Sequence, residues 1–179
     1  MRWFSILAVA VALALPASAR AQNITLGADF GYDRVVDHDT SGPGFNLYPG
    51  LSLGPIRAEA QLGYHRGVSD PLALGASELI TTYVPVMIGG RVGLPLGIVY
   101  PWVGGHGGFA YVGRTSGFGS RGALAYTDRE WEPAFNAGAG IDICLGSVAL
   151  GGAFWYNVAA DEDDPMRIAS AAVSVRINL

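Results

Sequence analysis

The sequence predicts an all-β fold: an eight-stranded antiparallel up-and-down transmembrane β-barrel, preceded by a cleaved signal peptide. Three observations lead to this prediction. Apolar and polar residues alternate over eight segments, the connections between segments are short and long in turn, and the polar positions hold small residues where a soluble sheet carries charges. A strand points successive side chains to opposite faces, so the alternation describes two separate surfaces.

The first 21 residues have the form of a secretory signal peptide. Arg2 precedes an uncharged apolar run over residues 3–15, and small residues lead to a cleavage site after Ala21, with a weaker alternative after Ala19. We therefore predict that residues 1–21 are the signal peptide and that residues 22–179 form one barrel domain.

Composition narrows the functional classes further. Cys144 is the only cysteine, so an internal disulfide is excluded. All 11 basic residues are arginines, and removal of Arg2 and Arg20 leaves nine against 15 acidic residues, a formal charge of −6. This balance argues against a nucleic-acid partner. Two uncharged windows are long enough to consider as membrane-spanning helices, residues 92–113 and 143–160. The first contains two prolines and seven glycines, and the second contains three glycines and Asn157, so neither suits a continuous helix.

Alternation is complete in four segments. In residues 23–32 the even positions run from Ile24 to Tyr32 and are apolar, whereas the odd positions are polar or glycine. The other three segments are residues 56–65, 135–143 and 169–179. Weaker alternation predicts four more strands, at residues 43–53, 78–92, 98–113 and 147–160.

The connections alternate in length. Short uncharged turns are expected at residues 54–55, 94–97 and 145–146. Longer polar connections are expected at residues 33–41, 66–76, 114–130 and 161–164. This pattern is typical of a meander with one plain end and one elaborated end.

Small inward side chains fit the interior of a narrow barrel, and a continuous apolar exterior fits a bilayer. The sheet must close, because lipid offers no partner for an unpaired strand edge. Outward aromatic residues toward the long connections form a candidate interfacial girdle. They are Tyr32, Tyr64, Phe109, Tyr111, Trp131, Phe154 and Tyr156.

The glycine-rich stretch around His106 is predicted to be a strand. It lacks the glycine spacing of nucleotide-binding loops, and no helix pattern follows it. Odd and even positions of a strand point to opposite faces, and we call the face that a position takes its parity. Because Phe109 and Tyr111 face lipid in this scheme, parity places Trp102 and His106 inside the barrel.

Ionisable groups at inward positions form a candidate polar network in the lumen. Its members are Asp29, Arg57, Glu59, His65, Arg91, His106, Asp142 and Arg176. Three arginines face three carboxylates, as buried charges require, so we expect a structural network without catalytic, cofactor-binding or metal-binding residues. Three pairs are expected to be in contact: Glu59 with Arg91, His106 with Asp142, and Asp29 with Arg176.

Four stretches carry a resemblance to a known family. They are PWVGGHGGFAYVGR (residues 101–114), NITLGADFGY (23–32), VPVMIGGRVGLP (84–95) and PAFNAGAGIDI (133–143). In these stretches the chain resembles the eight-stranded outer-membrane β-barrels of the outer membrane protein A and opacity-protein type, over nearly all of residues 22–179. The resemblance implies the outer membrane of a Gram-negative bacterium, surrounding lipids and lipopolysaccharide, and insertion by the barrel assembly machinery.

Several functions remain open at this point. The first is a structural or surface-interaction barrel with a plugged lumen, whose acidic extracellular loops contact an unidentified partner; the alternative is a narrow channel for ions or small solutes. An enzyme is disfavoured, because parity places no serine beside His65 or His106 and His38 falls in a connection. A soluble lipocalin-like carrier and a divalent-cation site at the acidic run 161–164 are weaker hypotheses.

Overall fold

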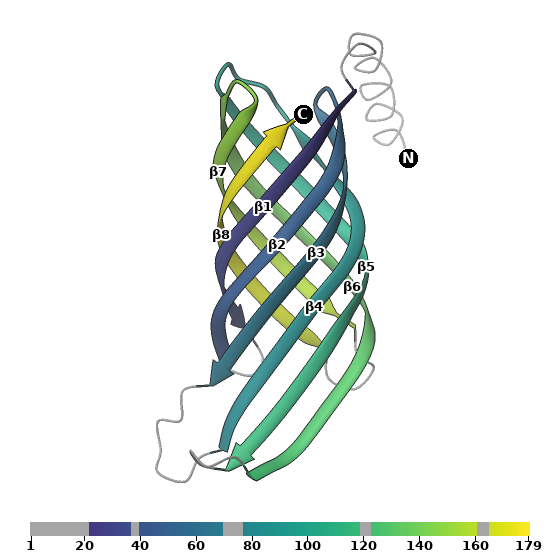
Figure 1. Ribbon diagram of the computed structural model, residues 1–179, viewed down its shortest axis with the longest axis vertical. Coiled ribbons are helices and arrows are strands. Elements are labelled where there is room, and N and C mark those ends of the chain that lie inside the picture. Colours follow the sequence, from purple (N-terminus) through teal and green to yellow (C-terminus); the bar gives the residue numbers. More distant parts are fainter. Residues whose placement is uncertain (1–21, 37–39, 70–76, 119–122, 161–164) are drawn as a thin grey trace, which may run out of the picture.

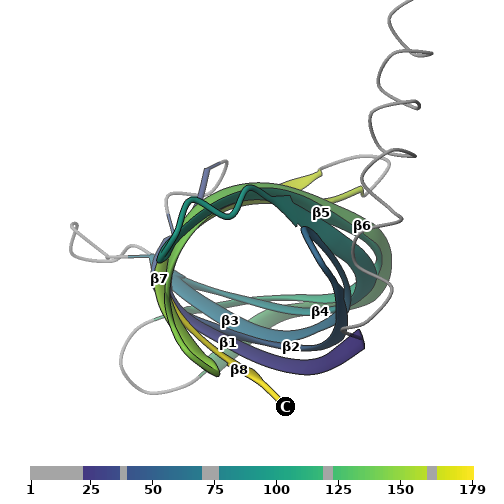
Figure 2. The same ribbon diagram turned by 90° about the horizontal axis from the view of Figure 1, so that it is seen from above.

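The residues described by a computed structural model are 22–36, 40–69, 77–118, 123–160 and 165–179. They form one antiparallel sheet that closes into a barrel (Figure 1). The strands follow one another in chain order, and β8 pairs with β1 to complete the ring (Figure 2). Their bounds are β1 Gln22–Val35, β2 Thr40–Leu53, β3 Ile56–Ser69, β4 Ser77–Gly93, β5 Val99–Phe118, β6 Ala123–Leu145, β7 Val148–Ala159 and β8 Met166–Asn178.

The predicted fold class is confirmed: the described residues make an eight-stranded up-and-down barrel. The predicted signal peptide, residues 1–21, lies outside the described residues. In the part of the chain that is described, no helix is both long and apolar enough to cross a membrane.

The strands extend further into the long connections than the alternation predicted. β5 and β6 remain paired as far as Phe118 opposite Ala123, with a shift of register between Ser116 and Gly117. The prediction that residues 114–130 form a loop is therefore wrong for most of that segment, and Figure 1 shows β4, β5 and β6 reaching beyond the other strands. The residues that pair there do not alternate between apolar and polar, so their sequence does not mark them as strands.

Short turns join the strands at the opposite end, where they were predicted. Each contains one glycine with a positive φ: 65° at Gly54, 70° at Gly97 and 71° at Gly146. A residue with a Cβ atom is destabilised in this left-handed region by about 1–2 kcal/mol. These glycines allow the chain to reverse within a few residues.

The outer surface of the barrel is apolar. Exposed side chains at outward positions include Phe30 at 60%, Ile88 at 75%, Val103 at 62% and Val173 at 65%. Such a continuous apolar surface is unfavourable in water and fits the hydrocarbon region of a bilayer. The predicted assignment of the apolar face to the outside is correct.

The predicted girdle aromatics also lie on this outer surface. Exposed members are Tyr32, Tyr64, Phe109, Trp131, Phe154 and Tyr156. Tyr111 is partly buried and packs edge-on against Trp131, with ring centroids 5.8 Å apart. Ala171 of β8 lies opposite Tyr32 of β1 on one side and opposite Phe154 of β7 on the other. Tyr32 and Phe154 therefore share a row across the three strands.

The interior holds two apolar clusters separated by amide side chains. Along β7, Ala159 belongs to the cluster near the long connections, Trp155 belongs to the cluster near the short turns, and the buried Asn157 lies between them. The first cluster comprises Val35, Tyr83, Met87, Ala110, Val112, Ala134, Ala159, Met166 and Ile168. The second comprises Tyr48, Tyr100, Trp102, Ala153 and Trp155.

Candidate functional site

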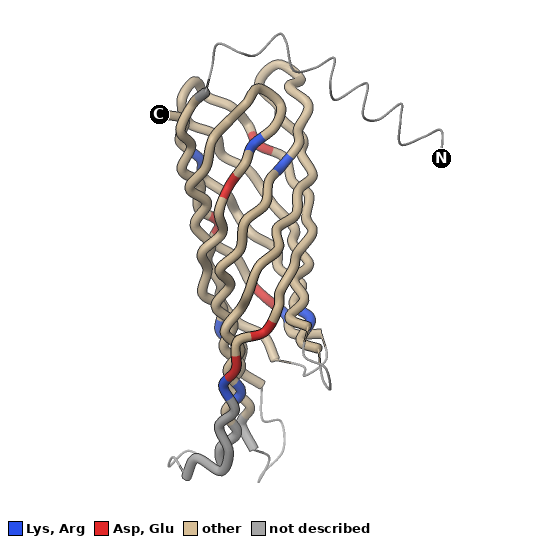
Figure 3. The backbone as a smooth tube through the Cα atoms, turned by 90° about the vertical axis from the view of Figure 1, so that its right-hand side faces the viewer, with Lys and Arg blue, Asp and Glu red and all other residues tan. Residues whose placement is uncertain are grey.

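The lumen is the candidate functional site. All eight ionisable residues that parity placed inside are buried there, none more than 5% exposed: Asp29, Arg57, Glu59, His65, Arg91, His106, Asp142 and Arg176. Figure 3 shows the charged residues gathered in two bands, one near the short turns and one near the long connections. The alternation of each strand is what directs these side chains inward.

Asp142 organises the end of the lumen near the short turns. Its Oδ2 accepts hydrogen bonds from Arg176 Nη1 at 2.6 Å and from Arg57 Nη1 at 3.2 Å. Its Oδ1 accepts from Trp102 Nε1 at 3.2 Å and, more weakly, from Ser174 Oγ at 3.4 Å. One carboxylate thus joins two buried guanidinium groups, an arrangement in which charge-assisted hydrogen bonds offset the cost of desolvation.

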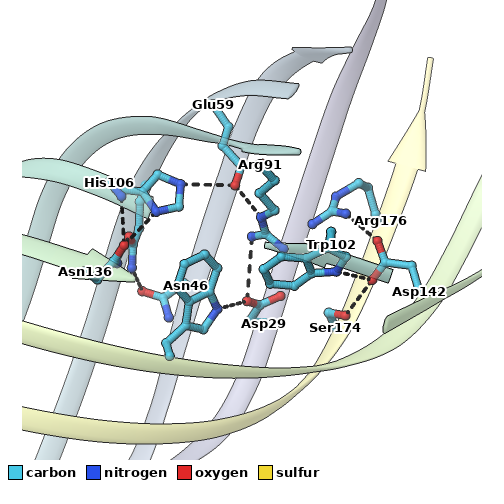
Figure 4. Close-up of polar contacts among 12 residues, drawn as sticks. Asp29, Asn46, Glu59, Arg91, Trp102, His106, Asn136, Asp142, Ser174 and Arg176 are labelled. Carbon is cyan, nitrogen blue, oxygen red and sulfur yellow. Dashed lines mark hydrogen bonds and ion pairs between the residues drawn. The ribbon is translucent and has the colours of Figure 1, made fainter. Parts of the chain in front are cut away.

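Arg91 lies between two carboxylates, those of Glu59 and Asp29 (Figure 4). Its Nε donates to Glu59 Oε1 at 2.5 Å, and its Nη2 lies 3.8 Å from Asp29 Oδ2. Asp29 Oδ2 also accepts a hydrogen bond from Trp155 Nε1 at 3.1 Å. The Glu59–Arg91 contact expected from the sequence is present.

Three aromatic rings surround the Arg91 guanidinium. Its carbon lies 4.3 Å from the ring centroid of Tyr48, 4.2 Å from that of Trp102 and 5.0 Å from that of Trp155. These are cation–π distances, and such contacts are stronger where water is excluded. We call Arg91 and these three rings the arginine cage.

Glycines on the adjacent strands, each the register partner of a cage residue, make room for the cage. A Cβ added at Gly138 would overlap the Trp155 ring, and one added at Gly140 would overlap the Trp102 ring. A Cβ added at Gly104 would come within 2.8 Å of Arg91 Cγ. The glycines of β5 and β6 therefore accommodate bulky neighbours, as expected for a narrow lumen.

His106 links the cage to the amide residues. Its Nε2 lies 3.1 Å from Glu59 Oε1, while its Nδ1 and its backbone N–H both contact Asn136 Oδ1 at 2.9 Å. A backbone N–H is always a donor, so the Asn136 atom that it meets must be the amide oxygen. Both ring nitrogens of His106 consequently face oxygen acceptors.

The orientation of Asn136 sets the direction of the hydrogen bonds that follow. Asn136 Nδ2 donates to Gln61 Oε1 at 2.6 Å, and Gln61 Nε2 donates to Asn46 Oδ1 at 2.8 Å. The same Asn46 oxygen is 3.1 Å from His65 Nε2, and His65 Nδ1 lies 2.6 Å from Asp33 Oδ2. A continuous polar chain therefore runs from Glu59 to Asp33 along the lumen.

A small cavity lies at the Asp33 end of this chain. Its volume is about 10 Å³, close to the minimum for one water molecule. It is lined by Asp33, Val35, His65, Gly67, Thr81, Tyr83, Met166 and Ile168. The space is too small for a solute larger than water.

Two of the expected contacts are wrong. Register places His106 opposite Asn136, and Asp142 opposite Tyr100, so His106 binds Asn136 and Glu59 instead of Asp142. The expected pairing of Asp29 with Arg176 is replaced by contacts of Asp29 with Arg91 and of Arg176 with Asp142. Both errors arise from the stagger of the barrel, which sets the height of each residue relative to distant strands.

Sequence reasoning also missed members of the network. Asp33 was assigned to a connection, although it continues the inward parity of Asp29 in β1. The other buried members that went unnamed carry no formal charge: Asn46, Gln61, Asn136, Asn157, Ser170 and Ser174. All have inward parity, so parity without regard to charge would have found them.

Among the described residues, the buried carboxylates are Asp29, Asp33, Glu59 and Asp142, and the buried arginines are Arg57, Arg91 and Arg176. Two buried histidines accompany them. In the same part of the chain, no group of three or more His, Cys, Asp or Glu residues could hold a metal ion.

A closed barrel with an apolar exterior and a charged, hydrogen-bonded interior defines an outer-membrane β-barrel. The protein is accordingly a β-barrel of the outer-membrane type. No family model matches the chain, and no curated protein matches it.

Several solved structures are similar to this chain, and the first of them shares its fold. Neisserial surface protein A superposes with a TM-score of 0.57 at 12% identity, over 88% of this chain and 96% of that one. The N-terminal β-barrel domain of Pseudomonas aeruginosa OprF has a TM-score of 0.47 at 16% identity, over 87% and 98% of the two chains. The Yersinia pestis outer membrane protein Ail has a TM-score of 0.48 at 14% identity, over 88% and 100%.

Proposed function

We propose that this protein is a non-conducting outer-membrane barrel of the outer membrane protein A and opacity-protein type. Its role is structural or one of surface interaction, its lumen is plugged, and its long connections meet partners outside the cell. The fold shared with Neisserial surface protein A supports the first part of the proposal. The remaining parts rest on the interior and on the charge of the connections.

The observation that carries the proposal is the filling of the lumen. The arginine cage crosses the barrel near its short turns, the amide residues follow, and the apolar cluster around Met166 and Ile168 lies beyond them. An eight-stranded barrel has an interior only wide enough for side chains. Side chains from most strands occupy that space and bond to one another, so solutes have no open path.

The interaction role is assigned to the long connections. Outside the eight lumen residues, the mature chain carries 12 acidic residues and six arginines, mostly in the connections and the strand ends beside them. Acidic loops suit a basic extracellular partner. Lipids and lipopolysaccharide would surround the barrel, and the barrel assembly machinery would insert it.

A non-enzymatic role agrees with the environment of the two buried imidazoles. The ring nitrogens of His106 contact Glu59 and Asn136, and those of His65 contact Asp33 and Asn46. A general base needs a ring nitrogen directed at the hydroxyl or thiol that it activates. These contacts are those of a structural network.

Recordings in planar lipid bilayers test the proposal. We expect no conductance steps from the refolded wild-type protein. A double variant, Arg91→Ser with Trp155→Ala, removes the centre of the arginine cage and should conduct if it folds. Folding of each protein is checked by its shift in mobility on unheated gels. Stable steps from the wild-type protein would contradict the plug and favour the narrow channel.

A further inference from the structure

Strand β6 has an open edge beyond the closed part of the barrel. It pairs with β5 from its first residue onward, whereas its pairing with β7 begins only at Ala134, opposite Ala159. One residue further out, the backbone N–H of Ala160 donates to the carbonyl oxygen of Pro133 at 2.8 Å. Among the described strands, none pairs with residues 123–132 on that side, and Figure 1 shows this part of β6 reaching outward together with β4 and β5. We call the unpaired side of residues 123–132 the open edge.

The backbone groups that face the open edge can be assigned from one hydrogen bond. In an antiparallel strand, the N–H and C=O groups of one residue point to the same side, and successive residues alternate between the two sides. The carbonyl group of Pro133 points toward β7. The groups of Thr127, Arg129 and Trp131 therefore point to the open edge, while those of the even-numbered residues pair with β5. The register shift of this hairpin falls beyond Thr127, so the alternation is unbroken here.

Strand β4 also reaches beyond its neighbour, but its edge is short and partly capped. Its pairing with β3 begins at Ile80, opposite Val68, so residues 77–79 extend beyond that strand. The backbone N–H of Leu79 donates to Ser69 Oγ at 2.8 Å. A long edge with unpaired backbone groups, by contrast, is a template for pairing with another chain. Among the described strands, β6 presents the longer edge of this kind.

The described side chains along the open edge are exposed on both faces. Trp131, which is 59% exposed, shares the outward face with the exposed Arg129. Glu130 is exposed on the opposite face. A strand added to the edge places one residue directly opposite each of these three, and such cross-strand pairs contribute to stability. The favourable partners are an aromatic or β-branched residue opposite Trp131, a basic residue opposite Glu130 and an acidic residue opposite Arg129.

A second copy of the chain fits this edge poorly. Two barrels inserted the same way in one membrane run their β6 strands in the same direction. An in-register pair of these strands would set Glu130 against Glu130 and Arg129 against Arg129, and like charges directly opposite are destabilising. The edge therefore favours a different chain.

We propose that residues 127–131 of β6 accept an extended segment of an extracellular protein as an added antiparallel strand. Main-chain hydrogen bonds supply the affinity, and a basic residue opposite Glu130 supplies the specificity. This inference rests on the surface-interaction role in the proposed function, and it names the site of that role and the conformation of the partner.

Amide NMR of the nitrogen-15-labelled full barrel in phosphatidylcholine nanodiscs tests the edge. The probe is the acetylated and amidated peptide Thr-Tyr-Lys-Glu-Thr-Val, titrated to millimolar concentration, with its lysine set opposite Glu130. The variant Arg129→Pro removes an N–H group that faces the open edge and leaves the pairing with β5 intact, because proline is tolerated on edge strands. Arg129→Gln loses the same charge but keeps the N–H group, so it is the matched control. Mobility on unheated gels checks that both variants fold.

We expect the peptide to bind Arg129→Pro about threefold to tenfold more weakly than Arg129→Gln, as the loss of one hydrogen bond implies. A peptide with glutamate in place of lysine should bind the wild-type protein about threefold or more weakly. In the wild-type protein, the peptide should slow hydrogen exchange at the amides of Thr127, Arg129 and Trp131 but not at those between them. This last measurement decides the matter if Arg129→Pro does not fold.

The absence of peptide binding to the wild-type protein, or equal slowing of odd and even amides, would overturn the added strand. Equal affinity of the two folded variants would also overturn it and would place the interaction on another surface. These outcomes concern the edge of β6 alone. The plugged lumen is tested separately by conductance, so failure of this inference is distinguishable from failure of the proposed function.

Discussion

The indole ring of Trp155 lies against the backbone of Gly138, its register partner across β6 and β7. A Cβ atom at position 138 would overlap the ring, and the backbone of the neighbouring strand is close as well. We therefore expect Gly138→Ala to displace Trp155 and to lower the free energy of unfolding by about 1–3 kcal/mol. Urea titration of the refolded barrel in lipid vesicles, followed by tryptophan fluorescence, measures this loss.

Gly107→Ala is the matched control for that substitution. Gly107 faces outward, and a Cβ added there would meet no atom within 4 Å. We expect a change between zero and about 1 kcal/mol of stabilisation, because alanine restricts the unfolded chain. If both glycine substitutions cost the same, the fit of Trp155 against Gly138 would not be a source of stability.

Asp142→Asn should be among the most destabilising isosteric changes in the lumen. It leaves Arg57 and Arg176 buried without their shared carboxylate, and the loss of one partner from a buried ion pair costs about 3–5 kcal/mol. Urea titration in vesicles gives the value. Addition of Arg176→Gln should recover part of the loss, since one uncompensated charge is removed.

Ser174→Ala serves as the control for the Asp142→Asn substitution. Its hydroxyl contacts the same carboxylate at 3.4 Å, a weak hydrogen bond, so we expect a loss of about 1 kcal/mol or less. The outcome that would contradict the role of Arg176 concerns the double variant Asp142→Asn/Arg176→Gln. If it is no more stable than Asp142→Asn alone, Arg176 gains little from the carboxylate.

Val175→Arg tests the membrane face of the barrel. Val175 is 37% exposed and lies opposite Ala28, near the middle of β1. An arginine on the lipid face at mid-depth costs about 2–4 kcal/mol. We expect this loss in vesicle unfolding experiments, with Val175→Leu changing stability by about 1 kcal/mol or less. Ala139→Arg, on the outer face of β6, should behave similarly. Normal stability of both arginine variants would mean that lipid does not cover this surface.

The two ring nitrogens of His106 meet different oxygens. Nε2 lies 3.1 Å from Glu59 Oε1, and Nδ1 lies 2.9 Å from Asn136 Oδ1. Glu59→Gln replaces the charged oxygen by a neutral amide, so in nitrogen-15 NMR of the imidazole it should shift the Nε2 signal more than the Nδ1 signal. Equal shifts of the two signals would contradict the contact of Nε2 with Glu59.

Much of this architecture was predictable, because a barrel in a membrane imposes a simple rule on each strand. Lipid covers one face of each strand and the narrow lumen the other, so apolar and polar residues alternate with period two. The outward position of Ile24 and the inward position of Asp29 can therefore be predicted without knowledge of the fold. The rule fails where the strands leave the membrane: the alternation missed the ends of β5 and β6. The backbone still pairs there, although the residues do not alternate between apolar and polar.

The sequence by itself determined the number of strands, the two faces and all the charged groups inside except Asp33. Only the tertiary structure decided which of those groups meet. Asp142 binds Arg57 and Arg176 from distant strands, and His106 binds Glu59, because stagger and curvature bring residues of different height and strand together across the lumen. Parity is a local property of one strand, whereas a contact across the barrel depends on the register of every pair between the two strands.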